Sequence, residues 1–460
     1  MIKKAFAWLL AAVLMIVLAV ALLLGFLPPL VGVRSILSPP AQTALALVDV
    51  TVLNPGEAPR PGQTVLIQGG SIVGVQAREL GLPVEYQRVE GVGRWVMPGL
   101  IDLHAHVFDE SDLAVMLAHG VTASRNMMGS PFQLRMRTAV AEGKLAGARL
   151  FSAGPTLDGT GAPLHRVVDT PAQAVEAVQD SVARGFDLIK VYDEVSPEVF
   201  AAIVAEAEAQ GIAVAGHLPA NVPLDAILTA YVSVEHAEEL WQNQLHEADD
   251  AAIDQVAARF VAHDTALVST LQIVQRLVDV CGGGEAALQQ VETPFINPLI
   301  AWMGRMGLQP WIAGAIDCDN FAGTVNRMQR ITERFHRAGV RIAVGTDYGP
   351  HLTAPGSSLH AELQQLARSG LSNDEVLIAA TRTPAAILGR SQTLGRVAAG
   401  HAADLLLLAK DPREDLANLQ QIDAVIADGR LYGPAEQEQL QAAGMDHAGI
   451  LLTLGRMLGR

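Results

Sequence analysis

Residues 97–389 contain a regular alternation of strand-like and helix-like segments, which limits the choice of fold more than any other feature. The helix candidates include residues 197–210, which follow Ser196 as an N-cap and are rich in alanine. Eight short strand candidates alternate with the helices, at residues 101–106, 121–127, 149–153, 188–192, 212–217, 232–236, 266–271 and 341–347. This is the pattern of a (β/α)8, or TIM, barrel. The sequence therefore predicts an α/β protein with its chemistry at the C-terminal ends of the strands.

Short strand patterns also flank the barrel region on both sides. Residues 41–96 hold strand candidates separated by Pro/Gly-rich turns, and residues 390–435 repeat this texture around an Asp428-Gly429 turn. Neither unit is large enough to close a core by itself. We therefore expect the two units to pair into one small β-sandwich, with the barrel inserted between them and residues 436–460 forming a C-terminal tail.

The first residues predict a membrane anchor. Lys3 and Lys4 precede residues 5–27, which are all apolar or small and long enough to cross a bilayer as a helix. We expect residues 1–40 to form an uncleaved transmembrane helix and a Pro-containing spacer. The lysines place the N-terminus inside, so the remaining chain would face the periplasm or the cell exterior. The alternative is a cleaved signal peptide and secretion.

Composition excludes some partners. The 460 residues carry 32 Lys and Arg against 48 Asp and Glu, a net charge of −16, which argues against a nucleic-acid partner. Cys281 and Cys318 are too few for a disulfide scaffold, but an oxidising compartment would allow them to pair with each other. Both lie in residues 272–330, a long link between the last two strands. We expect this link to form a lid or pocket wall, the alternative being a helical pair far from the site.

Metal-ligand residue types stand at the ends of five strand candidates. His104 and His106 alternate with apolar residues, so both rings lie on one face of the first strand, which suits a divalent metal such as zinc. The alternative is a pair of hydrogen-bonded core histidines. The ends of four later strands carry Lys190, His217, His236 and Asp347. Because strand ends of a barrel meet at one face, we expect all six side chains to form a metal site.

The order of these residues resembles the metal-dependent amidohydrolase superfamily, in which they follow one another in the same way. The resemblance includes the Met97-Pro98-Gly99 turn before the first strand and the Gly400-His401 tail. It is strongest with the branch of imidazolonepropionase-like and Xaa-Pro dipeptidase-like enzymes. Two segments depart from the family pattern, Ser124-Arg125-Asn126-Met127 and Gly216-His217-Leu218-Pro219. These departures concern the class of substrate more than the metal site.

The resemblance implies two divalent metal ions, most simply zinc. His104 and His106 would hold one with Asp347, and His217 and His236 would hold the other. Lys190 would bridge the two ions as a carbamate, because a protonated ammonium group has no lone pair to offer a metal. The alternative is an ordinary lysine paired with Asp193 or Glu194, and a single metal.

The resemblance also implies hydrolysis of a C–N bond in an amide, a cyclic amide or a dipeptide. A hydroxide that bridges the metals would attack the carbonyl, with Asp347 as general acid and base. A mononuclear deaminase or imidazolone-type ring hydrolase is one alternative, and an inactive membrane-tethered binding protein is another. Substrate contacts are expected from rim residues, Tyr192, His165, Arg166 and His351. The expected partners are a small-molecule substrate and the membrane, and a homo-oligomer is left open.

Overall fold

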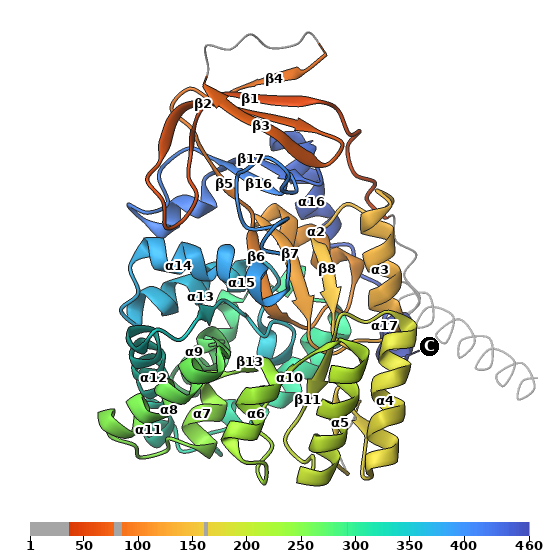
Figure 1. Ribbon diagram of the computed structural model, residues 1–460, viewed down its shortest axis with the longest axis vertical. Coiled ribbons are helices and arrows are strands. Elements are labelled where there is room, and N and C mark those ends of the chain that lie inside the picture. Colours follow the sequence, from red (N-terminus) through yellow and green to blue (C-terminus); the bar gives the residue numbers. More distant parts are fainter. Residues whose placement is uncertain (1–35, 78–84, 161–163, 292, 460) are drawn as a thin grey trace, which may run out of the picture.

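A computed structural model describes residues 36–459 except 78–84, 161–163 and 292 (Figure 1). The predicted membrane anchor, over residues 5–27, lies outside the described residues. Within the described part of the chain, no helix is long and apolar enough to cross a membrane.

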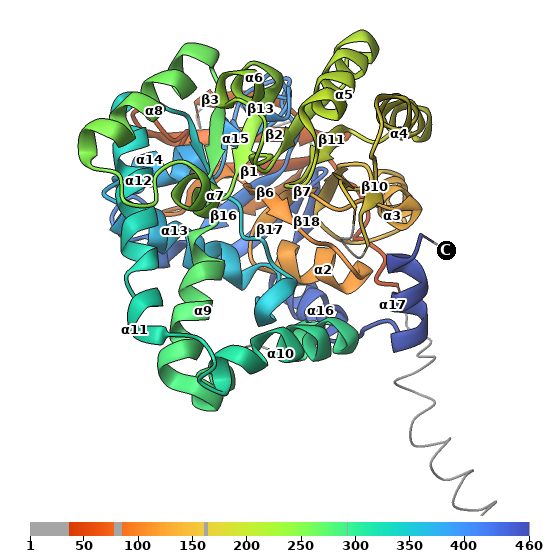
Figure 2. The same cartoon turned by 90° about the horizontal axis from the view of Figure 1, so that it is seen from below.

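Short parallel strands form the centre of the larger domain, and Figure 2 shows helices surrounding them. One sheet has the order β10-β9-β11-β12-β13-β14-β15, and the other has the order β6-β7-β8. The strands are β6 (Leu100–Ala105), β7 (Val121–Asn126), β8 (Arg149–Ser152), β9 (Leu157–Asp158), β10 (Arg166–Val167), β11 (Leu188–Val191), β12 (Ala213–Gly216), β13 (Tyr231–Glu235), β14 (Ala266–Val268) and β15 (Ile342–Ala343). Parallel bridges Ala153–Leu188 and Ala105–Tyr348 join the two sheets. The α/β class is confirmed, and the domain is TIM-barrel-like.

The helices that follow the strands cover the barrel. Their inward faces join the strands in one large apolar core, in which residues such as Phe260, Phe335 and Leu267 are fully buried. These helices are α2 (Glu110–Ala118), α3 (Pro131–Ala141), α4 (Pro171–Arg184), α5 (Pro197–Gln210), α6 (Leu224–Ala230), α7 (Ala237–Asn243), α8 (Asp250–His263), α12 (Thr324–Ala338), α13 (Ser357–Arg368), α14 (Asn373–Ala379) and α15 (Arg382–Ile387). Ser196 caps α5, because its side chain accepts a hydrogen bond from the Val199 amide.

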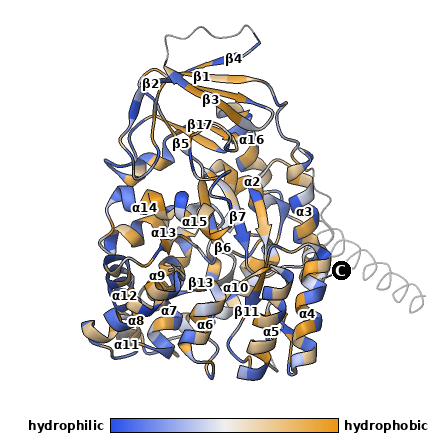
Figure 3. Ribbon diagram, viewed as in Figure 1, coloured by the Kyte–Doolittle hydropathy of each residue, from blue (hydrophilic) through white to orange (hydrophobic). Residues whose placement is uncertain are grey.

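The strands from the two flanking regions pair with each other, as expected. They form one continuous, hydrogen-bonded sheet of eight strands, whereas a β-sandwich was expected. The link between them is the pairing of β5 with β16. The strands are β1 (Leu45–Val52), β2 (Arg60–Gln68), β3 (Ser71–Ala77), β4 (Gln87–Glu90), β5 (Trp95–Pro98), β16 (Leu405–Leu408), β17 (Ile422–Ala427) and β18 (Arg430–Tyr432). β1 and β17 are both hydrophobic in Figure 3, and their side chains share one core that contains Leu45, Leu47 and Ile426. The barrel is inserted between these two strand groups.

The long link before β15 folds into helices against the open end of the barrel. It contains α9 (Leu271–Gly283), α10 (Pro298–Ile312) and α11 (Cys318–Phe321), with 3-10 turns at Gly284–Gln290 and Thr293–Phe295. Cys281 and Cys318 form a disulfide with their Cα atoms 5.5 Å apart, which confirms their predicted pairing. Two further 3-10 turns lie at Pro350–Leu352 and Leu416–Gln420.

The C-terminal tail packs on the barrel as α16 (Pro434–Gly444) and α17 (Ile450–Met457). The loop between them is held at the start of α2. There the Ala448 amide donates a hydrogen bond of 2.7 Å to Asp109, which also accepts one of 2.8 Å from the Asn297 side chain. Asn297 donates a further bond of 3.0 Å to Thr453 on α17. The tail therefore joins α2 to the helical link.

Candidate metal centre

The structure places all six predicted ligand residues at the C-terminal ends of the barrel strands. His104 lies on β6 and Lys190 on β11, and the other four follow the ends of β6, β12, β13 and β15. The His104 and His236 rings are 4.4 Å apart between centroids, and the His236 and His217 rings are 4.7 Å apart. The histidines are therefore neighbours around one point.

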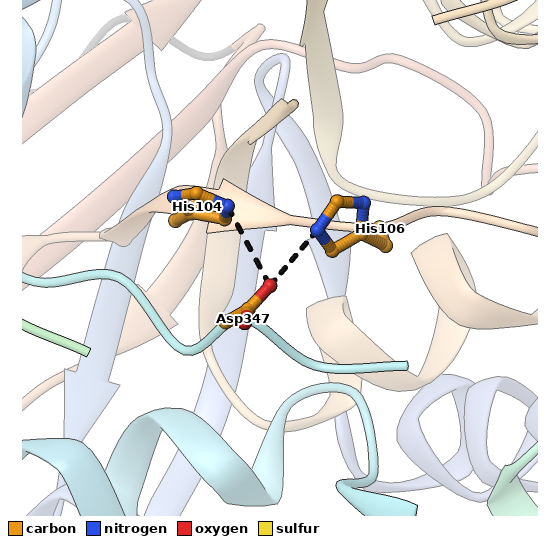
Figure 4. A group of neighbouring side chains, drawn as sticks. All are labelled: His104, His106 and Asp347. Carbon is orange, nitrogen blue, oxygen red and sulfur yellow. Dashed lines mark ion pairs between the residues drawn. The ribbon is translucent and has the colours of Figure 1, made fainter. Parts of the chain in front are cut away.

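Three ligand atoms converge from His104, His106 and Asp347. Asp347 Oδ1 lies 2.8 Å from His106 Nε2 and 3.5 Å from His104 Nε2 (Figure 4). The His104 ring is fully buried, and its Nε2 has no hydrogen-bond partner. Buried polar atoms in folded proteins nearly always have partners, so an unpartnered imidazole nitrogen that faces a carboxylate fits a metal ligand well. The donor set of these three residues matches a divalent metal ion.

Asp102 and Gly345 bring β6 and the end of β15 close enough for this convergence. Asp102 accepts a 2.7 Å hydrogen bond from the Thr346 hydroxyl and one of 3.1 Å from the His104 amide. A Cβ atom at position 345 would lie 2.7 Å from His104 Cβ, so glycine is required there. Asp347 then takes a left-handed conformation with φ 50°, uncommon for a residue other than glycine. This turn directs its carboxylate to the two histidines.

A buried ion pair supports His104 from behind. Glu235 Oε2 lies 2.8 Å from His104 Nδ1, and Glu235 Oε1 accepts a 2.7 Å hydrogen bond from Arg125. Arg125 also donates to the Leu103 carbonyl at 2.6 Å and to the Ser233 hydroxyl at 3.2 Å. A carboxylate at Nδ1 keeps the proton on that nitrogen and leaves Nε2 free to bind a metal.

The other side of the site has a different arrangement, in which His217 contacts two carboxylates. Its Nδ1 lies 2.9 Å from Asp193 Oδ1 and 3.2 Å from Glu239 Oε1, and these three residues form a second group able to hold a metal ion. His236 has φ 69°, and its Nδ1 lies 2.7 Å from the Thr270 hydroxyl oxygen. With both Nδ1 atoms engaged, Nε2 is the nitrogen that each ring offers to a ligand.

Lys190 lies between the two sides and is almost fully buried. Burial lowers the pKa of Lys190, although Glu235 and Asp347 act in the opposite direction. Asp193, which was one expected partner of an ordinary lysine, pairs with His217 instead. Burial of the Lys190 side chain therefore favours its neutral amine form.

The pKa values of the other predicted ligand residues shift in directions that depend on their partners. Burial lowers the pKa of His104 and of His236 well below the usual value, so both rings are neutral at pH 7. For Asp347, burial opposes ionisation, but the hydrogen bond and the charge of His106 outweigh it and lower its pKa to about 2. For His217, burial and Lys190 lower the pKa, whereas hydrogen bonds to Asp193 and Glu239 give a net rise.

The predicted substrate contacts have different surroundings. Tyr192 lies in the site, with its ring 3.9 Å from the His217 ring and 4.6 Å from the His165 ring. His165 is held by Asp158 at 2.8 Å. Arg166 instead donates a 2.9 Å hydrogen bond to Asp180 on α4, which neutralises the charge that a substrate carboxylate would need.

A cavity of about 260 Å³ adjoins the site, with His106 and His351 as its polar wall. Its remaining wall is apolar and comes from the barrel rim, the helical link and the tail, namely Phe108, Met128, Leu164, Ile300, Met303, Gly304, Gly307, Gly349 and Met457. The link therefore forms a pocket wall, as expected. A larger cavity of about 370 Å³ is lined by Arg149, Arg390 and Asp404 among others, but by none of the predicted site residues.

Comparison with known proteins decides the family. The model of the amidohydrolase family matches residues 95–432. The chain belongs to the amidohydrolase family. This family is generally metal-dependent, and membership makes the chain a hydrolase of C–N bonds.

Two solved structures show how far the amidohydrolase fold extends. Bottromycin amidohydrolase is 27% identical with a TM-score of 0.71, and the match covers 89% of this chain and 93% of that one. A putative prolidase from Bifidobacterium longum is 26% identical with a TM-score of 0.66, covering 88% and 100%. The predicted resemblance to Xaa-Pro dipeptidase-like amidohydrolases is thus confirmed.

Two curated relatives also match the chain. Ochratoxinase from Aspergillus niger is 23% identical over 459 residues, covering 84% of this chain and 85% of its own. Imidazolonepropionase from Chromobacterium violaceum is 42% identical over a short stretch of 76 residues, 16% of this chain and 18% of its own.

Sequence reasoning missed the residues that support the ligands. Glu235 and Arg125 stand in segments that the sequence marks as strand ends, but their pairing joins β13 to β7. Glu239 lies on α7 and meets His217 across a loop. A charged residue within a short, buried barrel strand was the available signal for Arg125 and Glu235.

Proposed function

We propose that this amidohydrolase cleaves an amide or dipeptide bond beside an apolar group, using two divalent metal ions, most simply zinc, and a carbamylated Lys190. The observation that carries this proposal is the unpartnered, buried His104 Nε2, which faces Asp347. His106, the third member of this group, lines the apolar cavity. His104, His106 and Asp347 would hold one ion. His217 and His236 would hold the other through their Nε2 atoms, and Asp193 and Glu239 would orient the His217 ring from its Nδ1 side.

Lys190 is suited to carbamylation because its surroundings favour the neutral amine. The Nζ lone pair would add to the carbon of CO₂, and the proton lost from the nitrogen would leave to solvent. The product is a carbamate, in which two oxygens share one negative charge. Two metal ions would repel a protonated Lys190, whereas they would attract the carbamate anion.

Asp347 is placed to move the proton of the reaction. Metal ions bound at this site would activate a water molecule and polarise the scissile carbonyl. Asp347 would accept the proton that this water loses and donate it to the leaving nitrogen as the C–N bond breaks. Its low pKa keeps it ionised. Tyr192 and His165 lie at the rim, where a neutral donor can hold the carbonyl oxygen.

The apolar cavity supports a hydrophobic acyl or prolyl substituent on the substrate. His351 lines the same cavity, and burial lowers its pKa, so it presents a neutral ring. We also propose that the enzyme is anchored by residues 5–27 with its catalytic body outside the cytoplasm. A reporter fused after Arg460 tests this, because cytoplasmic reporter activity would contradict it.

Turnover of purified, metal-loaded enzyme tests the proposed function. N-acyl amino acids with apolar acyl groups, X-Pro dipeptides and cyclic imides form the substrate panel, and aminopurines serve as the deamination control. We expect release of a free amine and a carboxylate from at least one amide class. Ammonia release from aminopurines alone would contradict the proposal and support a deaminase.

A further inference from the structure

Exposed apolar side chains gather on two neighbouring helices beside the cavity. On α10, Trp302 is 61% exposed and Met306 53% exposed. The large apolar residues that face solvent on α10, on α17 and at the end of α17 are Trp302, Met303, Met306, Leu451, Leu452, Leu454 and Leu458. α10 and α17 contact each other, and Figure 2 shows them side by side. We call the solvent-facing surface formed by these seven residues the α10–α17 face.

The orientation of α17 is the reverse of that of an ordinary surface helix. Its leucines at positions 451, 454 and 458 share one face at helical spacing, and that face points to solvent. Its polar residues point inward: Thr453 is fully buried, and Arg456 is only 9% exposed. Arg456 stacks on Phe132 at 4.0 Å and pairs with Glu110 at 3.0 Å. An apolar stripe that faces away from the protein core indicates another apolar partner.

The α10–α17 face also lacks acidic residues, although the chain has 48. Neither helix contains Asp or Glu, and their charged residues are Arg305 and Arg456. Arg305 pairs with Glu285, outside α10. The two helices therefore bring no carboxylate of their own into an apolar environment, where burying one would be costly, and Glu285 beside α10 is paired with Arg305.

The cavity next to the metal centre opens beside this face. Met303 lines the cavity and is itself 39% exposed, and Leu164 on the opposite rim is equally exposed. Met457, from the inner side of α17, completes the rim. Met303 therefore belongs both to the α10–α17 face and to the wall of the cavity.

The position of the described N-terminal end indicates which partner covers the face. Residues 5–27 are an apolar run of membrane-spanning length, and the described chain begins soon after it at Ile36. The Leu37 carbonyl accepts a 2.8 Å hydrogen bond from Ala146, just after α3. The other end of α3 meets α17, where the Ser130 hydroxyl donates to the Arg456 carbonyl at 3.2 Å. The described chain therefore begins near one end of α3, and α17 lies at the other end of α3, on the same side of the body (Figure 1).

We propose that the α10–α17 face rests on a lipid bilayer, with its leucines and Trp302 in the interfacial layer, as interfacial amphipathic helices do. The cavity would then take up the apolar part of an amphiphilic amide directly from the membrane. This second statement rests on the proposed amide hydrolysis, whereas the docking itself does not.

Fluorescence of labelled full-length protein in lipid nanodiscs tests the docking. A Leu452→Cys variant carries an environment-sensitive dye, and Val92→Cys is the control, because Val92 is 63% exposed in the β-sheet domain. The native cysteines do not react because they are joined in a disulfide. We expect spin-labelled lipid to quench the dye strongly at position 452 and weakly at position 92. Equal, weak quenching would overturn the proposal. A blue-shifted dye at position 452 that lipid does not quench would also overturn it and indicate a second copy of the chain on the face.

A second variant separates docking from chemistry. Leu451→Ser with Leu454→Ser changes only exposed residues, so turnover of a short, soluble amide should be unchanged. Turnover of a long-chain N-acyl amino acid embedded in vesicles should fall about tenfold, because the α10–α17 face no longer holds the cavity of the anchored enzyme at the lipid surface. Equal turnover of the embedded substrate by both enzymes would contradict uptake from the membrane. If no amide is turned over, the proposed function fails, and the quenching result still decides the docking.

Discussion

The two sides of the metal centre are built differently. On the His104 side, the ligands come from strand ends that are locked together, and the supporting Glu235 and Arg125 are fully or almost fully buried. On the His217 side, the supporting carboxylates come from a loop and from α7, and the Asp193 side chain is 39% exposed. Strand register therefore fixes the His104, His106 and Asp347 group, whereas the His217 group depends on a partly exposed loop carboxylate and on a helix.

The largest expected difference between the two sides of the metal centre is in kcat, because Asp347 is the proposed proton-transfer group. Asp347→Asn removes the carboxylate that accepts the proton, so we expect kcat to fall by about 10²–10⁴-fold. Asp193→Asn, on the solvent-exposed side, should cost far less. Steady-state kinetics on a common amide substrate measures both. A larger loss in Asp193→Asn would reverse the assignment of the two sides.

Metal affinity provides the next test of the comparison. Glu235→Gln keeps the size of the side chain but weakens the bond that orients His104, and it leaves Arg125 without its buried partner. We expect metal affinity at the His104 position to fall about 10–100-fold. Glu239→Gln is the matched variant on the other side and should change affinity less. Competition with a chelator measures both, and equal losses would show that the sides do not differ.

The pocket wall should affect substrate binding rather than chemistry. Met303→Gln places an amide in the apolar cavity, so we expect KM for an apolar amide to rise about tenfold with little change in kcat. Met306→Gln is the control, because Met306 lies on the same helix and does not line the cavity. An unchanged KM in Met303→Gln would remove the cavity from the substrate site.

The smallest expected effect is on thermal stability, and it concerns Glu362, a buried carboxylate near His236. Glu362 accepts hydrogen bonds from Ser269 and from the Gln272 amide, next to Thr270, which holds His236. Burial raises the pKa of Glu362 to about 7. A raised carboxyl pKa means that the folded state loses stability as pH rises from the unfolded pKa through about 7. Glu362→Gln removes this loss.

We therefore expect the Glu362→Gln variant to have a Tm a few degrees above that of the wild type at pH 8, with a smaller difference at pH 5. Thermal unfolding at the two pH values measures this. Glu375→Gln is the control, since hydrogen bonds to Ser372 lower the pKa of Glu375. A lower Tm for Glu362→Gln at both pH values would contradict the buried-charge account.

Much of the barrel and of the ligand set could be predicted from the sequence, because both depend on local pattern. The strand predicted at 188–192 is Leu188–Val191 in the structure, and the strand predicted at 121–127 is Val121–Asn126. The alternation of apolar and polar residues along β6 correctly predicted that the His104 and His106 side chains lie on one face of the strand. These features need only the period of a strand and the rule that strand ends meet at one face.

The contacts that the sequence did not reveal join residues far apart in the chain. Arg125 and Glu235 are an ion pair between β7 and β13, and neither strand shows by itself that the other residue is near. Arg166 was expected to bind a substrate carboxylate, but Asp180, one helix further on, neutralises it. His217 was expected beside a metal with His236, and its two carboxylate neighbours come from loop and helix geometry that sequence patterns do not specify.

The central claim is that Lys190 bridges two metal positions as a carbamate, and metal content tests it most directly. The wild type should contain about two metal ions per chain. The Lys190→Ala variant should contain about one and lose nearly all activity while its fold survives. Acetate should partly restore both, because only a two-oxygen anion is missing, and Lys190→Arg should not recover either. Unchanged metal content and full activity in Lys190→Ala would contradict the claim.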